Sequence, residues 1–449
     1  MDNVFDFRDQ LIDEYSAFSR SFAFISANDI KNKVESEYQK ERYWPQPLIQ
    51  INPNYQRAQS VQELAEEGLL HPKCAEIFRV GKSSEASEYK GHDLFLFKHQ
   101  MDALAKAKSN KSYVVTTGTG SGKSLSFFIP IVDAVLKAKD KDPTPKTRAI
   151  IIYPMNALAN SQLEEVNKFL VGYSNDEKPF TVARYTGQES AEERKAIADN
   201  PPDILLTNFM MLELILTRYE NTDRHVVENC QGLEFLVLDE LHTYRGRQGA
   251  DVAVLVRRLR EKLNAQNMVC IGTSATMSST GKLEERNRVV ANVASKLFGT
   301  PISKEEIIGE TLERVTTPSK GVHSIKAQLK DEVETAQFSW ASYEAFVDSP
   351  MAIWVELNLG IELPDDEPPK RATPKTLDEA SKLLAADAEV DEQQAKKALQ
   401  NFLVAANEMT NPAGRAPFAF KLHQFISGPG KVLATLEPAG LRTITLDAQ

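Results

Sequence analysis

A glycine-rich stretch ending in Gly-Lys-Ser has the residue types that bind phosphate groups. It follows the apolar run Tyr113-Val114-Val115. Glycines let backbone N–H groups turn inward around phosphate oxygens, and the ammonium of Lys123 can reach the β- and γ-phosphates of a nucleotide. The hydroxyl of Ser124 can ligate Mg²⁺. The predicted phosphate site comprises Thr117, Gly118, Thr119, Gly120, Ser121, Gly122, Lys123 and Ser124.

The residues that flank this loop favour a phosphate site over a flexible Gly/Ser turn. The apolar run before the loop predicts a strand, and Leu125–Leu136 is an apolar, helix-like segment. A loop between a strand and a helix lies at a helix N-terminus, which attracts anions. The first position departs from the general pattern, because Thr117 stands where glycine is usual.

A second chemical signal is a pair of carboxylates that closes the apolar run Phe235–Leu238. Asp239 could hold Mg²⁺ through water, and Glu240 could orient and deprotonate an attacking water. Acidic residues are common at strand ends, so the pair alone is a weak signal. It lies 116 residues after Lys123, across intervening strand–helix units, which argues against chance. We therefore predict Lys123, Asp239 and Glu240 as catalytic residues, with Asp239 also a metal ligand.

Further polar residues fit the same site by their order along the chain. Gln100 stands 23 residues before Lys123. Its amide offers a donor and an acceptor to the N6/N7 edge of adenine, although a glutamine on a helix is usually a surface residue. Ser274-Ala275-Thr276 follows the next apolar run, and hydroxyls there could link the carboxylates to a neighbouring lobe.

Short apolar runs alternate with helix-like segments through the middle of the chain. Strands are predicted at 148–153, 180–185, 203–207, 233–238 and 268–273, and helices at 159–170, 191–198, 210–218 and 250–263. Short, continuously apolar strands spaced by helices are typical of a parallel sheet covered on both faces. We therefore expect an α/β fold whose ligand lies at the carboxyl ends of the strands.

The chain of 449 residues is too long for one core, so two or three domains are expected. Residues 1–90 predict a mostly helical accessory region, and residues 91–300 contain the α/β block. Residues 301–416 predict a helical accessory region with a flexible link near 363–376, where proline and charge are frequent. Residues 417–449 predict the start of a β-rich segment.

Composition limits the partners and the compartment. The net charge is −10 overall but +2 for residues 91–300, so this block is the least hostile to a polyanion such as nucleic acid. Cys74, Cys230 and Cys270 are widely scattered and indicate free thiols in a reducing cytoplasm. We expect a cytoplasmic protein, because no run is apolar for the ~18 residues of a membrane span and no secretory signal is visible.

Together these stretches resemble the superfamily 2 helicases, the DExD/H-box group, over roughly residues 94–277. The resemblance implies a RecA-like P-loop NTPase domain that uses ATP and Mg²⁺. It also implies that loop amides, hydroxyls and a helix N-terminus bind a nucleic-acid backbone without reading sequence. The residues at the matching nucleic-acid positions are Pro154, Asn156, Ala157, Tyr185, Thr186, Gly187, Thr207 and Asn208. The residues matched to coupling roles are His242, Ser274 and Thr276.

Two longer stretches, Asp239–Leu259 and Leu422–Gln449, are similar to large bacterial helicases of the Lhr-like and MrfA/DrmA type, which include DISARM phage-defence proteins. In that group a second RecA-like lobe follows and supplies arginine fingers to the ATP site. We expect this lobe to be missing from the chain and to come from a downstream segment or a separate chain. Tyr244–Gly249 more plausibly lines the loop and helix start than replaces an arginine finger.

The resemblance implies the motor lobe of an ATP-dependent helicase or translocase, acting on DNA rather than RNA, in DNA repair or phage defence. It would be poorly active without a second lobe. The alternative is a nucleotide-dependent module that binds nucleic acid or a partner without unwinding. A P-loop kinase or transporter ATPase is a third class, against which the strand-contact loops and the lack of an ABC-type signature argue.

Overall fold

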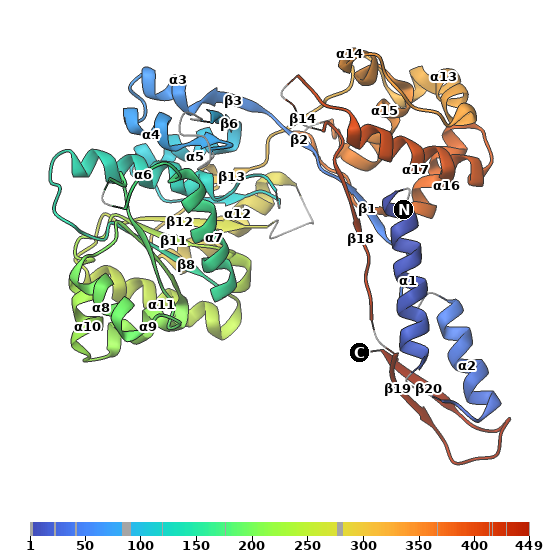
Figure 1. Ribbon diagram of the computed structural model, residues 1–449, viewed down its shortest axis with the longest axis horizontal. Coiled ribbons are helices and arrows are strands. Elements are labelled where there is room, and N and C mark those ends of the chain that lie inside the picture. The colour runs from blue at the N-terminus through green and yellow to red at the C-terminus, as the bar shows by residue number, and fades with distance from the viewer. Residues whose placement is uncertain are drawn as a thin grey trace. The chain divides into compact units, whose positions relative to one another are not determined.

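A parallel sheet of seven strands forms the centre of residues 55–311 in the computed structural model (Figure 1). The strands are β7 (Tyr113–Thr116), β8 (Ala149–Tyr153), β9 (Val182–Tyr185), β10 (Ile204–Asn208), β11 (Phe235–Leu238), β12 (Val269–Ser274) and β13 (Ile307–Gly309). Their order is β13-β7-β12-β11-β8-β10-β9, and all neighbours run parallel. The predicted α/β class, a parallel sheet with helices on both faces, is confirmed for this part of the chain.

The structure describes residues 3–21, 24–40, 43–82, 91–118, 120–175, 177–275, 282–365, 367–412, 414, 416–427 and 429–448. Two of the predicted site residues, Thr119 and Thr276, lie outside these ranges. The chain divides into two compact units, one of residues 55–311 and one of residues 1–54 together with 312–449. The short strands β2 (Asn54–Tyr55) and β14 (Leu312–Glu313) stand where the chain passes from one unit to the other.

Successive strand residues face two different apolar layers. Tyr113 and Val115 of β7 belong to one core cluster, whereas Val114 belongs to the other. Helices α5, α6 and α7 cover the first face, and α9, α11 and α12 cover the second. The helices of this unit are α3 (Val61–Glu66), α4 (Pro72–Ile77), α5 (Lys98–Lys108), α6 (Leu125–Lys139), α7 (Asn156–Phe169), α8 (Ala191–Asp199), α9 (Phe209–Thr217), α10 (Asn221–Glu228), α11 (Gly246–Lys262) and α12 (Leu283–Phe298), with the 3₁₀ turns η1 (Leu241–Thr243) and η2 (Lys304–Glu306). Because both faces of the sheet are buried, its central strands are rich in apolar residues on both sides.

Residues 55–97 pack with the sheet rather than with the chain before them. The strand β3 (Arg57–Ser60) pairs with β6 (Phe95–Phe97), and β4 (Arg79–Val80) pairs with β5 (His92–Asp93). Side chains of α3 and α4 join the core of the first sheet face. This grouping differs from the segment 1–90 expected from the sequence. The predicted division into the ranges 1–90, 91–300, 301–416 and 417–449 stays a prediction, because a compact unit need not fold alone.

The second unit combines the two ends of the chain. Its elements are α1 (Val4–Ser21), α2 (Asn28–Gln39), β1 (Leu48–Ile51), α13 (Val322–Thr335), α14 (Tyr343–Val347), α15 (Pro350–Val355), η3 (Glu356–Gly360), β15 (Ile361–Glu362), β16 (Lys370–Arg371), β17 (Lys375–Thr376), α16 (Leu377–Ala388), α17 (Glu392–Glu408), β18 (Phe420–His423), β19 (Pro429–Ala434) and β20 (Ile444–Ala448). The central strand β1 pairs antiparallel with β17 and β18. Near the chain ends, α2 lies beside the β19–β20 hairpin, where Arg442 pairs with Asp29 at 3.2 Å (Figure 1).

No helix in the described part of the chain combines the length and the apolar character needed to cross a membrane.

Candidate nucleotide site and nucleic-acid interface

The glycine-rich loop and the carboxylate pair meet at the carboxyl edge of the sheet. The loop follows β7, the carboxylates follow β11, and β12 lies between these two strands. The Lys123 Nζ atom lies 3.5 Å from Glu240 Oε1. The structure therefore brings together two groups that are 117 residues apart in the sequence. This is the edge at which a parallel sheet is expected to bind ligand.

The loop is held against α5 by two side chains beneath it. Gln100 Nε2 donates to the Gly122 carbonyl at 2.9 Å, and Gln100 Oε1 accepts from the Phe97 N–H at 2.8 Å. A Cβ atom on Gly122 would lie 2.7 Å from Gln100 Nε2, and the φ of +70° at this position also favours glycine. Gln100 thus supports the loop in this structure, and its contact with adenine stays a prediction.

His99 is the second support; it belongs to the stretch that resembles the helicase group, but the sequence assigned it no role. Its Nε2 atom lies 3.0 Å from the Ser121 carbonyl, and its buried Nδ1 atom has no hydrogen-bond partner among the described residues. Burial lowers the pKa of His99 to about 4, so the ring is neutral near pH 7. A neutral ring with its proton on Nε2 donates to the loop carbonyl.

An acidic side chain from the edge strand also contacts the loop. Glu310 Oε1 accepts a hydrogen bond from the Gly118 N–H at 2.9 Å. The register that pairs Gly309 with Thr116 brings Glu310 to this position, directly after β13. This contact was not predicted, because β13 has only three residues and was not recognised as a strand. Within the loop, Thr117 and Ser121 share a hydrogen bond of 2.6 Å between their hydroxyls.

One threonine hydroxyl fixes both carboxylate residues. Thr273 Oγ1 donates to Asp239 Oδ1 and accepts from the Glu240 N–H at 3.2 Å. Burial raises the pKa of Asp239, and the Thr273 hydrogen bond partly offsets this effect. Glu240 has a φ of +52°, an uncommon conformation for a residue other than glycine, which turns the chain sharply from β11 into η1. Sequence reasoning missed Thr273, although the pairing of Leu238 with Gly272 makes it the neighbour of Asp239.

The structure also brings together two of the residues predicted to couple the site to a neighbouring lobe. His242 Nδ1 lies 3.2 Å from Ser274 Oγ and 3.2 Å from Glu240 Oε2. Leu241 anchors the turn that carries His242, because its side chain packs against Gly272. A Cβ atom at Gly272 would lie 2.3 Å from Leu241 Cδ1, so only glycine lets the turn come this close.

The ammonium of Lys123 shows what ligand this edge can take. Its Nζ atom is buried and makes no hydrogen bond to any atom of the described residues. Because an ammonium group has three donors and a buried charge needs partners, the 3.5 Å contact with Glu240 leaves most of this capacity free. A polyphosphate supplies the missing acceptors, and Asp239 and Ser124 are oxygen donors of the kind Mg²⁺ prefers. The residues present therefore fit a nucleotide with its metal ion.

The three loops predicted to contact nucleic acid are tied together by Asn208. Its Nδ2 atom donates to Asn156 Oδ1 at 2.6 Å and to the Thr186 carbonyl at 3.1 Å. Its Oδ1 atom accepts from the Met211 N–H at 2.7 Å and so caps α9. All three loops follow neighbouring strands, β8, β9 and β10. One amide side chain thus sets the spacing of the predicted strand-contact surface.

Several of the residues predicted to contact nucleic acid are buried and already hydrogen-bonded within the protein. Thr207 donates to the Tyr185 carbonyl at 2.7 Å, and both side chains are inaccessible to solvent. Glu189, which was not predicted, accepts from the Thr186 N–H at 2.7 Å and the Gly187 N–H at 2.9 Å. Pro154 and Asn156 are half-buried, and Ala157 and Gly187 are exposed. A nucleic-acid strand laid across this edge would therefore contact the helix start near Asn156 and the turn at Gly187. It would not reach the buried side chains of Tyr185 and Thr207.

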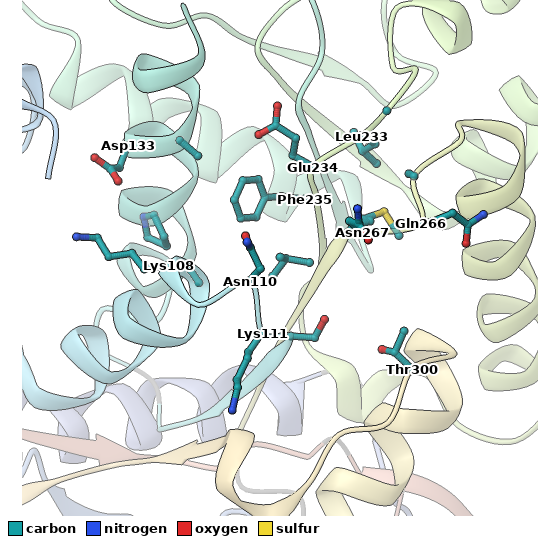
Figure 2. A pocket seen from close by; sticks show the side chains of 18 of the residues that line it. Lys108, Asn110, Lys111, Asp133, Leu233, Glu234, Phe235, Gln266, Asn267 and Thr300 are labelled. Carbon is teal, nitrogen blue, oxygen red and sulfur yellow. The ribbon is translucent and has the colours of Figure 1, made fainter. Parts of the chain in front are cut away.

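A cavity of about 1050 Å³ lies at the opposite edge of the sheet (Figure 2). Its lining includes Ser112 directly before β7, Phe235 at the start of β11 and Met268 directly before β12. Figure 2 shows the Phe235 ring with the polar side chains of Glu234 above it and Asn110 below it. Because strands begin here and the nucleotide loop follows strand ends, this cavity is separate from the nucleotide site.

Comparison with known proteins agrees with this geometry. Residues 97–283 match the family described as DEAD/DEAH box helicase. This segment is a DEAD/DEAH box helicase domain. The resemblance to the DExD/H-box group inferred from the motifs is thereby confirmed for the segment.

Relatives of this helicase domain are known from several organisms. The uncharacterized ATP-dependent helicase YprA of Bacillus subtilis is 33% identical over 193 residues, which cover 42% of this chain and 24% of that protein. The Lhr helicase/uracil glycosylase of Escherichia coli is 30% identical over 186 residues, or 38% of this chain and 12% of that protein. The crystal structure of the DUF1998 helicase MrfA bound to DNA superposes with a TM-score of 0.40 and 22% identity, over 64% of this chain and 38% of that one. The chain spans about a quarter or less of the length of these two curated relatives.

Proposed function

We propose that this chain provides the ATP-binding and ATP-hydrolysing motor lobe of a nucleic-acid helicase or translocase. The observation that carries the proposal is the buried Lys123 ammonium, which has no hydrogen-bond partner among the described residues and lies 3.5 Å from Glu240. It stands at the ligand-binding edge of a domain that matches the DEAD/DEAH box helicases. The named ATP-dependent helicases among the relatives support the same activity.

Each polar group of the site has a task in this proposal. Lys123 and the loop amides bind the phosphates, and Ser124 and Asp239 hold Mg²⁺. The metal ion, when bound, neutralises charge that develops on the transferred phosphoryl group. Glu240 orients the attacking water and accepts its proton, while Thr273 fixes the position of this carboxylate through the backbone N–H.

DNA is the proposed nucleic acid, and DNA repair or phage defence is the proposed setting, both on the strength of the motif resemblance. Its backbone is proposed to cross the three loops joined by Asn208, with Asn156 and Gly187 closest to it. A second RecA-like lobe, from a longer form of the protein or a separate chain, is proposed to close over the nucleotide.

ATP turnover with and without a single-stranded oligonucleotide tests the proposal. Glu240→Gln should keep binding of a fluorescent ATP analogue and slow turnover by about 10²–10⁴, because it removes the general base. Asn156→Ala should keep nucleotide binding and lose stimulation by DNA. Its matched control is Asn267→Ala, an exposed asparagine at the opposite edge of the sheet, which should behave as the parent chain.

Two results would decide against parts of this proposal. DNA stimulation that survives in Asn156→Ala rejects the strand path across the loops. Nucleotide-dependent binding of DNA or a partner, with no turnover even in the presence of a second lobe, favours the alternative of a binding module that does not unwind.

A further inference from the structure

We infer that Met155 and Met210 form a subsite that contacts the bases of an unpaired strand, beside the proposed phosphate contacts. The inference rests on the proposed function, because it concerns how the same edge of the helicase domain holds nucleic acid. The two methionine side chains are 59% and 63% exposed. Among the large apolar side chains described in residues 55–311, only Tyr219 is more exposed.

Both methionines stand at one edge, at equivalent places on neighbouring strands. Tyr153 of β8 pairs in register with Asn208 of β10, and each methionine lies two residues beyond its member of this pair. The hydrogen bond of 2.6 Å between Asn208 and Asn156 closes the space between the two loops. The methionines therefore flank the residues at which the backbone of the strand is proposed to bind.

Met155 departs from the usual residue preference at a helix N-cap, although most of its side chain is exposed. Met155 is the N-cap residue of α7 and makes no side-chain cap hydrogen bond. Serine, threonine, aspartate or asparagine would stabilise the helix start, typically by about 1 kcal/mol. A methionine here gives up that stabilisation and leaves most of its side chain in solvent. Positions that depart from local preference in this way are expected at functional sites.

The chemistry of methionine suits a base rather than a phosphate. Its side chain is unbranched, flexible and polarizable, so it can pack against rings of different shape. Every base has a π-face, so contact with that face tolerates any sequence. Single exposed apolar side chains are ordinary on a protein surface. Here Met155 and Met210 lie at the same edge as polar groups that fit a nucleic-acid backbone. An unpaired nucleic-acid strand has both a backbone for the polar groups and exposed bases for the methionines.

Binding of two labelled strands by the full chain tests the inference. One probe is a fluorescein-labelled oligothymidine, and the other is a strand of equal length with abasic sites. Replacing both methionines, as Met155→Ala with Met210→Ala, should weaken oligothymidine binding about fivefold, because apolar area is no longer buried. The abasic strand should bind the variant and the parent chain equally. The salt dependence should not change, since no charge is removed.

Val254→Ala is the matched control, because Val254 is 55% exposed on α11 of the same unit. It should leave the affinity for both strands unchanged, and all variants should keep the thermal midpoint of the parent chain. An equal loss on both strands, or no loss on either, overturns the base contact while the proposed function stands. A parent chain that binds neither strand overturns the proposed nucleic-acid function and this inference with it.

Discussion

His99 shows how a single buried side chain supports the nucleotide loop. Its Nε2 atom faces the Ser121 carbonyl, and its Nδ1 atom has no acceptor among the described residues. Protonation would place a second N–H on the buried Nδ1 atom, where no described group can accept it. Burial accordingly lowers the pKa of His99 to about 4, against 6.5 for a free histidine.

This pKa predicts that mild acid destabilises the domain. Between pH 6.5 and pH 4 the unfolded chain binds a proton at His99 that the folded chain does not, so the free energy of unfolding falls as the pH falls through this window. His99 accounts for about 3 kcal/mol of this loss of stability. At pH 7 none of this stability has yet been lost. Chemical denaturation at a series of pH values measures it.

His99→Gln is the informative variant, because an amide can still donate to the loop carbonyl but does not titrate in this range. Its stability should fall less between pH 6.5 and pH 4 than that of the parent chain. His225→Gln, at an exposed histidine on α10, is the control and should follow the parent curve. Identical pH curves for His99→Gln and the parent chain would contradict the assignment.

A site residue could be predicted when the residue types next to it in the sequence form a recognisable pattern. The loop 117–124 and the pair Asp239-Glu240 carry their chemistry in local residue types and spacing, so they were found from the sequence. Thr273 and Glu310 act through partners on other strands, set by the register of the sheet. A threonine or glutamate by itself has no pattern, so these two residues emerged only with the fold.

The elements could be predicted where their apolar pattern was long enough. Strands β8 to β12 are short and mostly apolar, and each was expected to within a few residues. The strand β13 has three residues and follows a change of rhythm, so it was missed. The helix α10 was also missed, because its sequence is mostly polar. The segment 363–376 contains the short strands β16 and β17, and its flexibility stays a prediction.

Gly272 of β12 provides a test at the level of elements. A methyl group there would lie 2.3 Å from Leu241 Cδ1 and 3.1 Å from Phe298 Cζ, so η1 must move away from the sheet. Gly272→Ala should lower the free energy of unfolding by about 1–3 kcal/mol, as overpacking does. Because η1 carries His242, ATP turnover should also fall. Denaturant unfolding and turnover measure the two effects.

Gly309→Ala is the matched control for this substitution. Gly309 lies in β13 of the same sheet, and a Cβ atom there meets no atom within 4 Å. This variant should keep the stability of the parent chain to within about 0.5 kcal/mol. Equal effects of the two substitutions would show that the close approach of Leu241 to β12 is unimportant.

At the scale of the whole molecule, the proposed function predicts that groups outside the described residues complete the nucleotide site. The chain spans 24% of the length of its Bacillus relative, so residues elsewhere in such proteins can contribute to the same chemistry. Under the proposed function, a second RecA-like lobe brings an arginine to the γ-phosphate. Adding this lobe, in a longer form of the protein or as a separate chain, should raise ATP turnover by about 10³–10⁵, because the arginine stabilises charge in the transition state.

This increase in ATP turnover supports the proposal only if it depends on the catalytic residues of this chain. Combined with the second lobe, Glu240→Gln should remain slow, since the arginine does not replace the general base. A second lobe with its arginine changed to alanine should give no gain with the parent chain, although it should still bind. If the parent chain alone turns over ATP as fast as it does with the lobe, the groups already placed around Lys123 are sufficient. The proposal that a second RecA-like lobe is needed for fast ATP turnover would then be wrong.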